Sequence, residues 1–373
     1  MDLPVDTGRL VYRIAFASLR GFNASVAREM LSRVGDEETF FDMSERQLCS
    51  LLGHSSRIFD RSYRDSLLED ARREVDFVVS GDIRPLYFTD DDYPTRLAEC
   101  DDAPVMLYSL GHSRLNDSPV IAIVGTRHAT SYGVDRVNDI VATLASRLAV
   151  PPVVVSGLAF GIDIAAHRAA LSCHVPTVAV LAHGLNTIYP AVHRRDAAAI
   201  ARDGGMLLTE YRSIDATHKG NFLARNRIIA GLSDCVLVAE SAEKGGAIVT
   251  ARLGADYNRE VAAIPGRSTD RYSAGCNRMI HNHTATLVTS ADDILELMQW
   301  PVRDAEPVQQ RLFPSLSPEE EAIVSLLTDR GDMRQTELAA ALSIPTPRLM
   351  GLLIDMEFKS LIAPIPGGRY RLA

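Results

Sequence analysis

The sequence predicts an α/β protein built on an extended, mostly parallel sheet, with a smaller domain on either side of it in the chain. From residue 119 onward, short β-branched runs alternate with amphipathic stretches of helical length, which is the order of β-α-β units. The runs are apolar along their whole length, as expected for strands that are covered on both faces. This pattern is typical of an extended Rossmann-like sheet. The predicted strands are 120–124, 153–156, 177–181, 206–209, 235–238 and 261–264.

Residues 1–80 are expected to form a small helical domain ahead of the sheet. Apolar residues recur at helical spacing from Leu10 to about Ile58, and a glycine within 19–22 predicts a turn between two helices. A SAM/helix-hairpin-helix-like domain fits this pattern, and such a turn can grip backbone phosphates. Glycine turns are equally common in bundles that bind nothing, so both interpretations stay open. An acidic connecting segment with two prolines follows, within a sheet domain assigned to residues 81–300.

Residues 301–314 are predicted to be a linker, because prolines stand among polar residues without helical or strand periodicity. Residues 315–373 are predicted to form a winged-helix-like domain of three helices followed by a glycine-tipped hairpin. A helix that reads bases usually carries more Arg, Asn or Gln than the third of these, in which Arg348 and Lys359 are opposed by two acidic residues. Protein contact or plain packing is therefore favoured over duplex recognition. The three helices are expected at 320–327, 335–342 and 346–358.

The composition limits the classes of function. The formal net charge of −9 disfavours a generic polyanion binder, so any nucleic-acid site must be a local basic patch. The five cysteines show no CxxC spacing, which predicts free thiols in a reducing compartment. The first residues lack a signal-peptide pattern and no run of about 18 apolar residues occurs, which predicts a cytoplasmic protein without membrane contact.

The loop after the first strand is suited to phosphate. Gly125 lets the backbone approach an anion, Thr126 and Ser131 supply hydroxyls, and Arg127 can clamp phosphate oxygens. The helix that begins here directs free amides and a positive dipole end at the same point. The spacing does not match GxGxxG and no Walker lysine follows, which disfavours a mononucleotide site.

The turn after the second strand places Gly157 at the same sheet edge, followed by Asp163 and His167. This pair could be a general base with its partner, or two metal ligands. A helix cap and a local hydrogen bond are favoured instead, because no third ligand or nucleophile follows. We therefore expect neither a metal ion nor a cofactor.

The segment from Lys219 to Arg227 combines cations with an aromatic ring. Stacking of a base on Phe222 is worth about 1–3 kcal/mol without sequence preference, and Lys219 can hold the adjoining backbone. Helical spacing predicts Arg225 and Asn226 on or near the face of Phe222, although Phe222 could also be a core residue. Two further groups at strand exits were assigned to phosphate: an amide nest beside Lys244 and Gly246, and arginines at positions 194 and 195, which could equally be solvated.

Together these motifs resemble the DNA processing protein A (DprA/Smf) family over about residues 86–297. The resemblance implies a dimer that binds and protects incoming single-stranded DNA in a basic pocket and helps load a RecA-type recombinase during natural transformation, with no chemical reaction. By motif position, it also implies that Arg127, Lys219 and Phe222 hold nucleotides. The matching motifs are Val124–Arg127, Ser156–Asp163 with Ala166–His167, Gly184 with Tyr189–Pro190, Arg225–Ser233, Gly246–Thr250 and Pro265–Gly266.

Two other classes of function remain open. One is a Rossmann-like nucleotide phosphoribohydrolase, in which Glu240 or Asp163 acts on a ribose bond, although the PGGxGT spacing of those enzymes is absent. The other is a protein-interaction scaffold whose basic residues are only solvated.

Overall fold

The computed structural model describes residues 6–303, 316–359, 361–365 and 368–372. Internal contacts divide the chain into two units, Met1–Arg303 and Asp304–Ala373, which are described separately. Most of the predicted linker, residues 304–314, lies outside the described residues.

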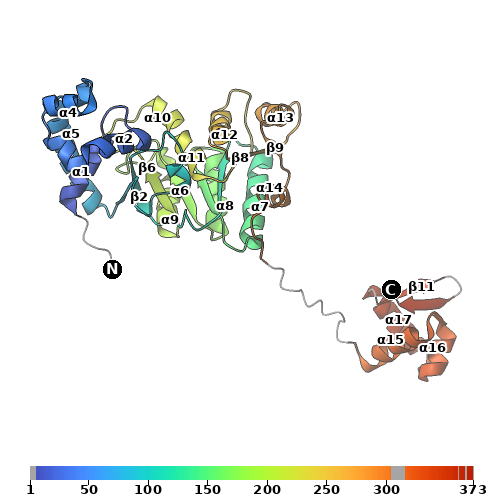
Figure 1. Cartoon of the computed structure of the whole chain (residues 1–373). Coiled ribbons are helices and arrows are strands. Elements are labelled where there is room, and N and C mark those ends of the chain that lie inside the picture. Colours follow the sequence, from blue (N-terminus) through green and yellow to red (C-terminus); the bar gives the residue numbers. More distant parts are fainter. Residues whose placement is uncertain (1–5, 304–315, 360, 366–367, 373) are drawn as a thin grey trace. The chain divides into compact units, whose positions relative to one another are not determined.

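The first unit is built on a nine-stranded sheet in the order β1-β2-β6-β5-β4-β3-β7-β8-β9 (Figure 1). The seven strands from β6 to β9 in this order are parallel, whereas β1 and β2 are antiparallel to their neighbours. The mostly parallel α/β sheet predicted from the sequence is confirmed. The six predicted strands are β3 (Val120–Val124), β4 (Val153–Ser156), β5 (Thr177–Val180), β6 (Met206–Thr209), β7 (Cys235–Val238) and β8 (Glu260–Ala263).

Three strands were not predicted. β1 (Arg84–Tyr87) and β2 (Met106–Gly111) extend one edge of the sheet, and β9 (Thr286–Leu287) extends the other. β1 is a four-residue edge strand with Pro85 inside it, and an edge strand tolerates a residue without an N–H. The segment expected to connect two domains therefore supplies part of the sheet.

Alternate residues of β3 enter different cores, because successive side chains point to opposite faces. Ile121 and Ile123 pack on one face with α7 (Ser131–Arg147), α8 (Ile162–Ser172) and α14 (Ala291–Met298). Val120, Ala122 and Val124 share the opposite core with α11 (Asn226–Leu232) and α12 (Gly246–Asp256). The helices that follow β3 and β7 thus lie on opposite faces. The remaining helices of the sheet region are α6 (Thr95–Ala98), α9 (Arg194–Arg202), α10 (Lys219–Ala224) and α13 (Ala274–His281).

The N-terminal helices, blue in Figure 1, lie beside the β1–β2 end of the sheet. Gly21 has φ +81° between the first two of them, as a glycine turn requires. Their core contains Phe16, Phe40 and Phe41 and is continuous with one sheet face. The buried Arg64 guanidinium donates to the carbonyls of Phe40 and Phe41 and joins the helices. They are α1 (Thr7–Ala17), α2 (Ala24–Val34), α3 (Glu37–Asp42), α4 (Glu45–Leu52), η1 (Arg57–Phe59) and α5 (Arg61–Ser80).

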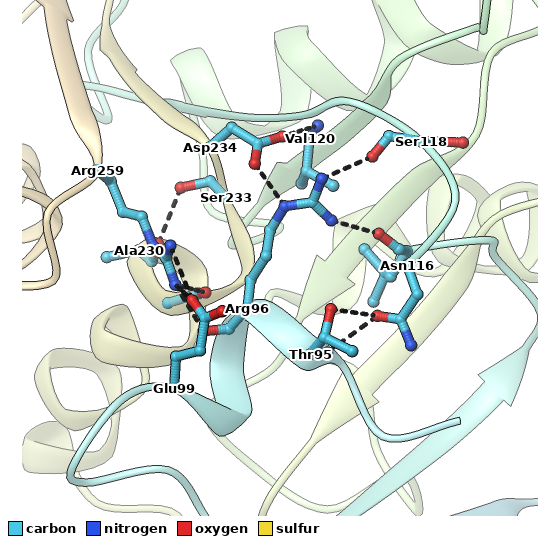
Figure 2. A network of polar contacts seen from close by, with 12 residues as sticks. Thr95, Arg96, Glu99, Asn116, Ser118, Val120, Ala230, Ser233, Asp234 and Arg259 are labelled. Carbon is cyan, nitrogen blue, oxygen red and sulfur yellow. Dashed lines mark hydrogen bonds and ion pairs between the residues drawn. The ribbon is translucent and has the colours of Figure 1, made fainter. Parts of the chain in front are cut away.

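A polar network fastens the β1–β2 segment to the parallel strands (Figure 2). The Arg96 guanidinium in α6 donates to Asp234 Oδ1 at 2.5 Å and to the Ser118 carbonyl at 3.0 Å. Asp234 Oδ2 accepts the Val120 N–H at 2.8 Å, at the start of β3. One arginine therefore ties three segments together, and the position of β3 does not depend on apolar packing alone.

The second unit has its own core, which includes Ile323, Leu338, Leu349 and Leu353. Its three helices occur where the sequence predicts them, and its three strands form a sheet in the order β10-β12-β11. Its assignment as a winged helix stays a prediction. The elements are α15 (Pro318–Arg330), β10 (Met333–Arg334), α16 (Gln335–Leu342), α17 (Thr346–Phe358), β11 (Ile362–Ile365) and β12 (Arg369–Leu372).

Among the described helices, none is by itself both long and apolar enough to cross a membrane, although α16 and α17 taken together, bent by 113°, pass by length and composition.

Candidate functional site

A cavity of about 320 Å³ lies where β3 and β7 end. These strands are neighbours in the sheet, and the chain leaves them toward opposite faces, which opens a crevice at their carboxyl ends. Eight of the twelve residues that the sequence predicts for the site line this one cavity. They are Gly125, Thr126, Arg127, Lys219, Phe222, Arg225, Asn226 and Gly246.

The loop after β3 is held by the segment that follows β7. The Thr126 N–H donates to the Glu240 carbonyl at 2.7 Å, and the two Glu240 carboxylate oxygens accept from the N–H and hydroxyl of Thr130. A Cβ at position 125 would come within 2.5 Å of the Ile162 side chain. Gly125 is therefore required by close packing, and the loop is fixed before any ligand arrives.

Arg127, Lys219 and Phe222 come together at the mouth of the cavity. The Arg127 guanidinium carbon lies 5.9 Å from the centre of the Phe222 ring. Both cationic side chains are exposed, and neither makes an ion pair with any described residue, whereas Phe222 is half-buried. Two free positive charges beside an accessible ring are suited to an anionic ligand that also carries a flat ring.

Arg225 lines the base of the cavity but faces inward, contrary to the expectation that it shares the face of Phe222. Its side chain is buried, and Nη1 donates to the carbonyls of Gly157 (2.9 Å) and Val180. Burial lowers the pKa of Arg225 to about 10, opposed by the charge of Asp163, so the guanidinium stays protonated near neutral pH. Arg225 fixes the ends of β4 and β5 beneath the cavity.

Four predicted residues do not line the cavity. Gly157 lies beneath it, where a Cβ would come within 2.4 Å of the Arg225 guanidinium. Arg227 donates to the Asp102 carbonyl at 2.8 Å and forms an ion pair with Glu210. Ser131 is exposed at the start of α7, and Lys244 lines a separate cavity of about 440 Å³ beside α12 and α13. A DNA contact at these four positions stays a prediction.

Several lining residues were not identified from the sequence. Ala159, Ser241 and Thr250 each contribute to the cavity wall. Small residues of this kind carry no recognisable chemistry, and only their position beside strand-end glycines could have indicated them. Asp163, considered from the sequence as a possible base, lies at the cavity base with its pKa raised by burial, which the nearby Arg225 opposes.

His167 is a structural residue buried beneath the same turn. Its Nε2 accepts the Leu158 N–H at 3.3 Å and its Nδ1 lies 2.7 Å from the Thr177 hydroxyl, so the ring is held neutral. Burial lowers the pKa of His167 to about 3, and Arg225 adds to this effect. Within the described residues, no group of three His, Cys, Asp or Glu side chains is placed to hold a metal ion.

The His167 geometry predicts acid sensitivity. Because an unfolded histidine takes up a proton below about pH 6.5 and this one does not until about pH 3, stability is expected to fall as the pH is lowered between these values. The expected loss between pH 7 and pH 5 is about 2 kcal/mol. Urea unfolding at both values measures it, and His167→Gln should lose this part of the pH dependence. An identical dependence in the variant would contradict the assignment.

Comparison with known proteins gives a consistent result. A family model described as DNA recombination-mediator protein A matches residues 84–299. The putative DNA processing protein DprA of Mycobacterium tuberculosis H37Rv is 36% identical over 324 residues, which cover 81% of this chain and 82% of that protein.

Two solved structures are also similar. The DNA processing protein A of Streptococcus pneumoniae superposes with a TM-score of 0.62 at 31% identity, covering 77% of this chain and 98% of that one. A Helicobacter pylori DNA processing protein A, described in terms of its single-stranded DNA binding mode, gives a TM-score of 0.52 at 30% identity, covering 58% and 95%.

Proposed function

This chain belongs to the DNA recombination-mediator protein A family, and on that basis we propose that it binds single-stranded DNA in the cavity at the ends of β3 and β7. The observation that carries the proposal is the meeting of Arg127, Lys219 and Phe222 at one cavity mouth. Phosphates of the strand bind the two cations, and one base stacks on the Phe222 ring. The single-stranded DNA binding described for the Helicobacter pylori relative supports the same ligand class.

The proposed ligand is an unpaired strand rather than a duplex. In a duplex the bases are stacked and paired, so a side chain at the bottom of a crevice reaches a base only after it has been unstacked at a cost of a few kcal/mol. Phe222 is half-buried within the cavity wall, which suits a base that is already free. The overall negative charge of the chain also disfavours broad binding to duplex phosphates.

We further propose that the chain acts as a homodimer and delivers the bound strand to a RecA-type recombinase, protecting incoming DNA during natural transformation. Family membership supports this role. The fixed strand-end loops support it as well, because a preformed site can bind and release DNA without reorganising.

The phosphoribohydrolase alternative requires an accessible carboxylate beside a ribose. Glu240 is 3% exposed and both of its carboxylate oxygens already accept hydrogen bonds from Thr130. Asp163 is buried and lies against the Arg225 guanidinium. These positions favour a binding site over hydrolysis, and release of free base from nucleoside monophosphates would argue for the enzyme.

Salt dependence tests the proposed contacts. If Arg127 and Lys219 neutralise two phosphates, the logarithm of the affinity for oligo-dT should fall against the logarithm of salt concentration with a slope of about −1.4. Fluorescence anisotropy with a labelled oligonucleotide measures this slope, and a duplex of the same length is the matched control. A flat salt response, or tighter binding of the duplex, would contradict the proposal.

A further inference from the structure

Exposed aromatic rings continue beyond the cavity along the ends of β4 and β5. Tyr189 is 53% exposed, and its ring centre lies 5.5 Å from that of Phe222 in an edge-to-face arrangement. Phe160 is 46% exposed in the turn after β4, next to Ala159 of the cavity wall, and its ring centre lies 5.1 Å from that of His193. Exposed rings of this size are costly to leave in water, and here they adjoin a proposed base-binding ring.

The backbone around both rings is held rigidly. The Tyr189 N–H donates to His183 Nε2 at 3.1 Å, and the buried His193 ring contacts the Leu158 carbonyl through Nδ1 at 2.8 Å. The turn that carries Phe160 is fastened to the loop after β3, because the Ile162 N–H donates to the Thr126 carbonyl at 3.1 Å. The rings are therefore presented by a scaffold that does not need to be ordered by a ligand.

Two arginines stand at the far end of this surface. Arg194 and Arg195 are exposed at the start of α9, directly after His193, and neither makes an ion pair or side-chain hydrogen bond within the described part of the chain. The neighbouring Arg168 and Arg202 are both paired with aspartates. Cations at a helix N-terminus oppose the helix dipole, so a bound phosphate would relieve an unfavourable arrangement.

The opposite flank of the cavity uses its aromatic groups internally. The His128 ring stacks on Tyr272 with centres 5.8 Å apart, and the Tyr132 hydroxyl donates to the Pro265 carbonyl at 2.9 Å. A second cation, Arg271, also lies over the Tyr272 ring. These rings are less available to a base than Phe160 and Tyr189.

The cavity volume requires an exit path for the strand. About 320 Å³ is at the lower end of the range for ligand sites, enough for roughly one nucleotide. We infer that the adjoining nucleotides leave the cavity over Tyr189 and Phe160, with their phosphates directed to Arg194 and Arg195. This inference rests on the proposed function and adds a second binding region to it, which we call the β4–β5 track (Phe160, Tyr189, Arg194 and Arg195).

Oligonucleotide length separates the track from the cavity. Binding of labelled dT3 and dT15 to the full chain is measured by fluorescence anisotropy, with dT3 as a competitor if its binding is weak. Phe160→Ser, Tyr189→Ser and the double variant Arg194→Glu/Arg195→Glu should each weaken dT15 at least about fivefold, the lower end expected for one lost stacking contact. The affinity for dT3 should change less than about twofold. Phe160→Ser is the decisive single variant, because Phe160 makes no ring contact with Phe222.

The matched control reverses the same charges on the opposite flank, with Arg267→Glu/Arg271→Glu expected to leave both affinities within about twofold. The inference is overturned if the track variants bind dT15 like the unmodified chain, if Phe160→Ser weakens dT3 and dT15 equally, or if the control pair alone loses affinity. The proposed function is judged separately by binding to the unmodified chain and by Arg127→Glu, so it can stand when the track fails.

Discussion

Replacing Arg127 by glutamate is expected to weaken binding of oligo-dT by at least about 30-fold, and Lys219→Glu should have an effect of similar size. Each change removes a charge-assisted contact, worth about 1.5–3 kcal/mol, and places a negative charge beside the strand. Both side chains are exposed and unpaired with any described residue, so neither substitution breaks an internal contact. Fluorescence anisotropy measures the affinity, and circular dichroism checks that the fold is retained.

Arg46→Glu is the matched control for these two variants. Arg46 is exposed on α4 in the N-terminal helices and has no ion pair among the described residues, so the same charge reversal is made away from the cavity. Its affinity for oligo-dT should stay within about twofold of that of the unmodified chain. Unchanged binding in both Arg127→Glu and Lys219→Glu, or an equal loss in Arg46→Glu, would remove the cavity from the mechanism.

Replacing Arg225 by methionine should lower the free energy of unfolding of the first unit by about 3–5 kcal/mol, the usual cost of removing one partner from a buried charged pair. The change leaves the Gly157 and Val180 carbonyls without their donor and Asp163 without its nearest positive charge. The chain has one tryptophan, Trp300, which packs against the core of the first unit. Trp300 fluorescence during urea unfolding therefore reports on that unit.

Two comparisons sharpen this test. Arg202→Met removes an exposed arginine that pairs with Asp203 at the surface, and its effect should stay within about 0.5 kcal/mol. Adding Asp163→Asn to Arg225→Met should recover part of the lost stability, because it removes the unpaired charge. A loss below about 1 kcal/mol in Arg225→Met would show that the buried guanidinium does not hold the ends of β4 and β5.

The parts of the fold that could be predicted from the sequence are those set by apolar pattern. β3 to β8 are short runs buried on both faces, and each shows this in its composition. β1 and β2 could not be found in the same way, because β1 contains a proline and both pair antiparallel at the edge. Their place depends on distant contacts such as that of Arg96 with Asp234, which no local pattern reveals.

The candidate site was predicted at the level of loops and less well at the level of single side chains. Glycine turns after β3 and β7 identified the correct sheet edge, because parallel strands bring their carboxyl ends together. The inward direction of Arg225 was missed, since the spacing argument assumed one continuous helix through Phe222 and Asn226. The helix divides there, with α10 ending at Ala224 and α11 beginning at Asn226, and the break turns Arg225 toward the sheet.

The most direct test is a crystal structure of the chain with a short oligo-dT. We expect a phosphate within hydrogen-bonding distance of Arg127 and Lys219, with one base stacked on Phe222 at the ends of β3 and β7. An oligonucleotide bound only to residues 304–373, or only in the groove beside α12 and α13, with the cavity empty, would contradict the account.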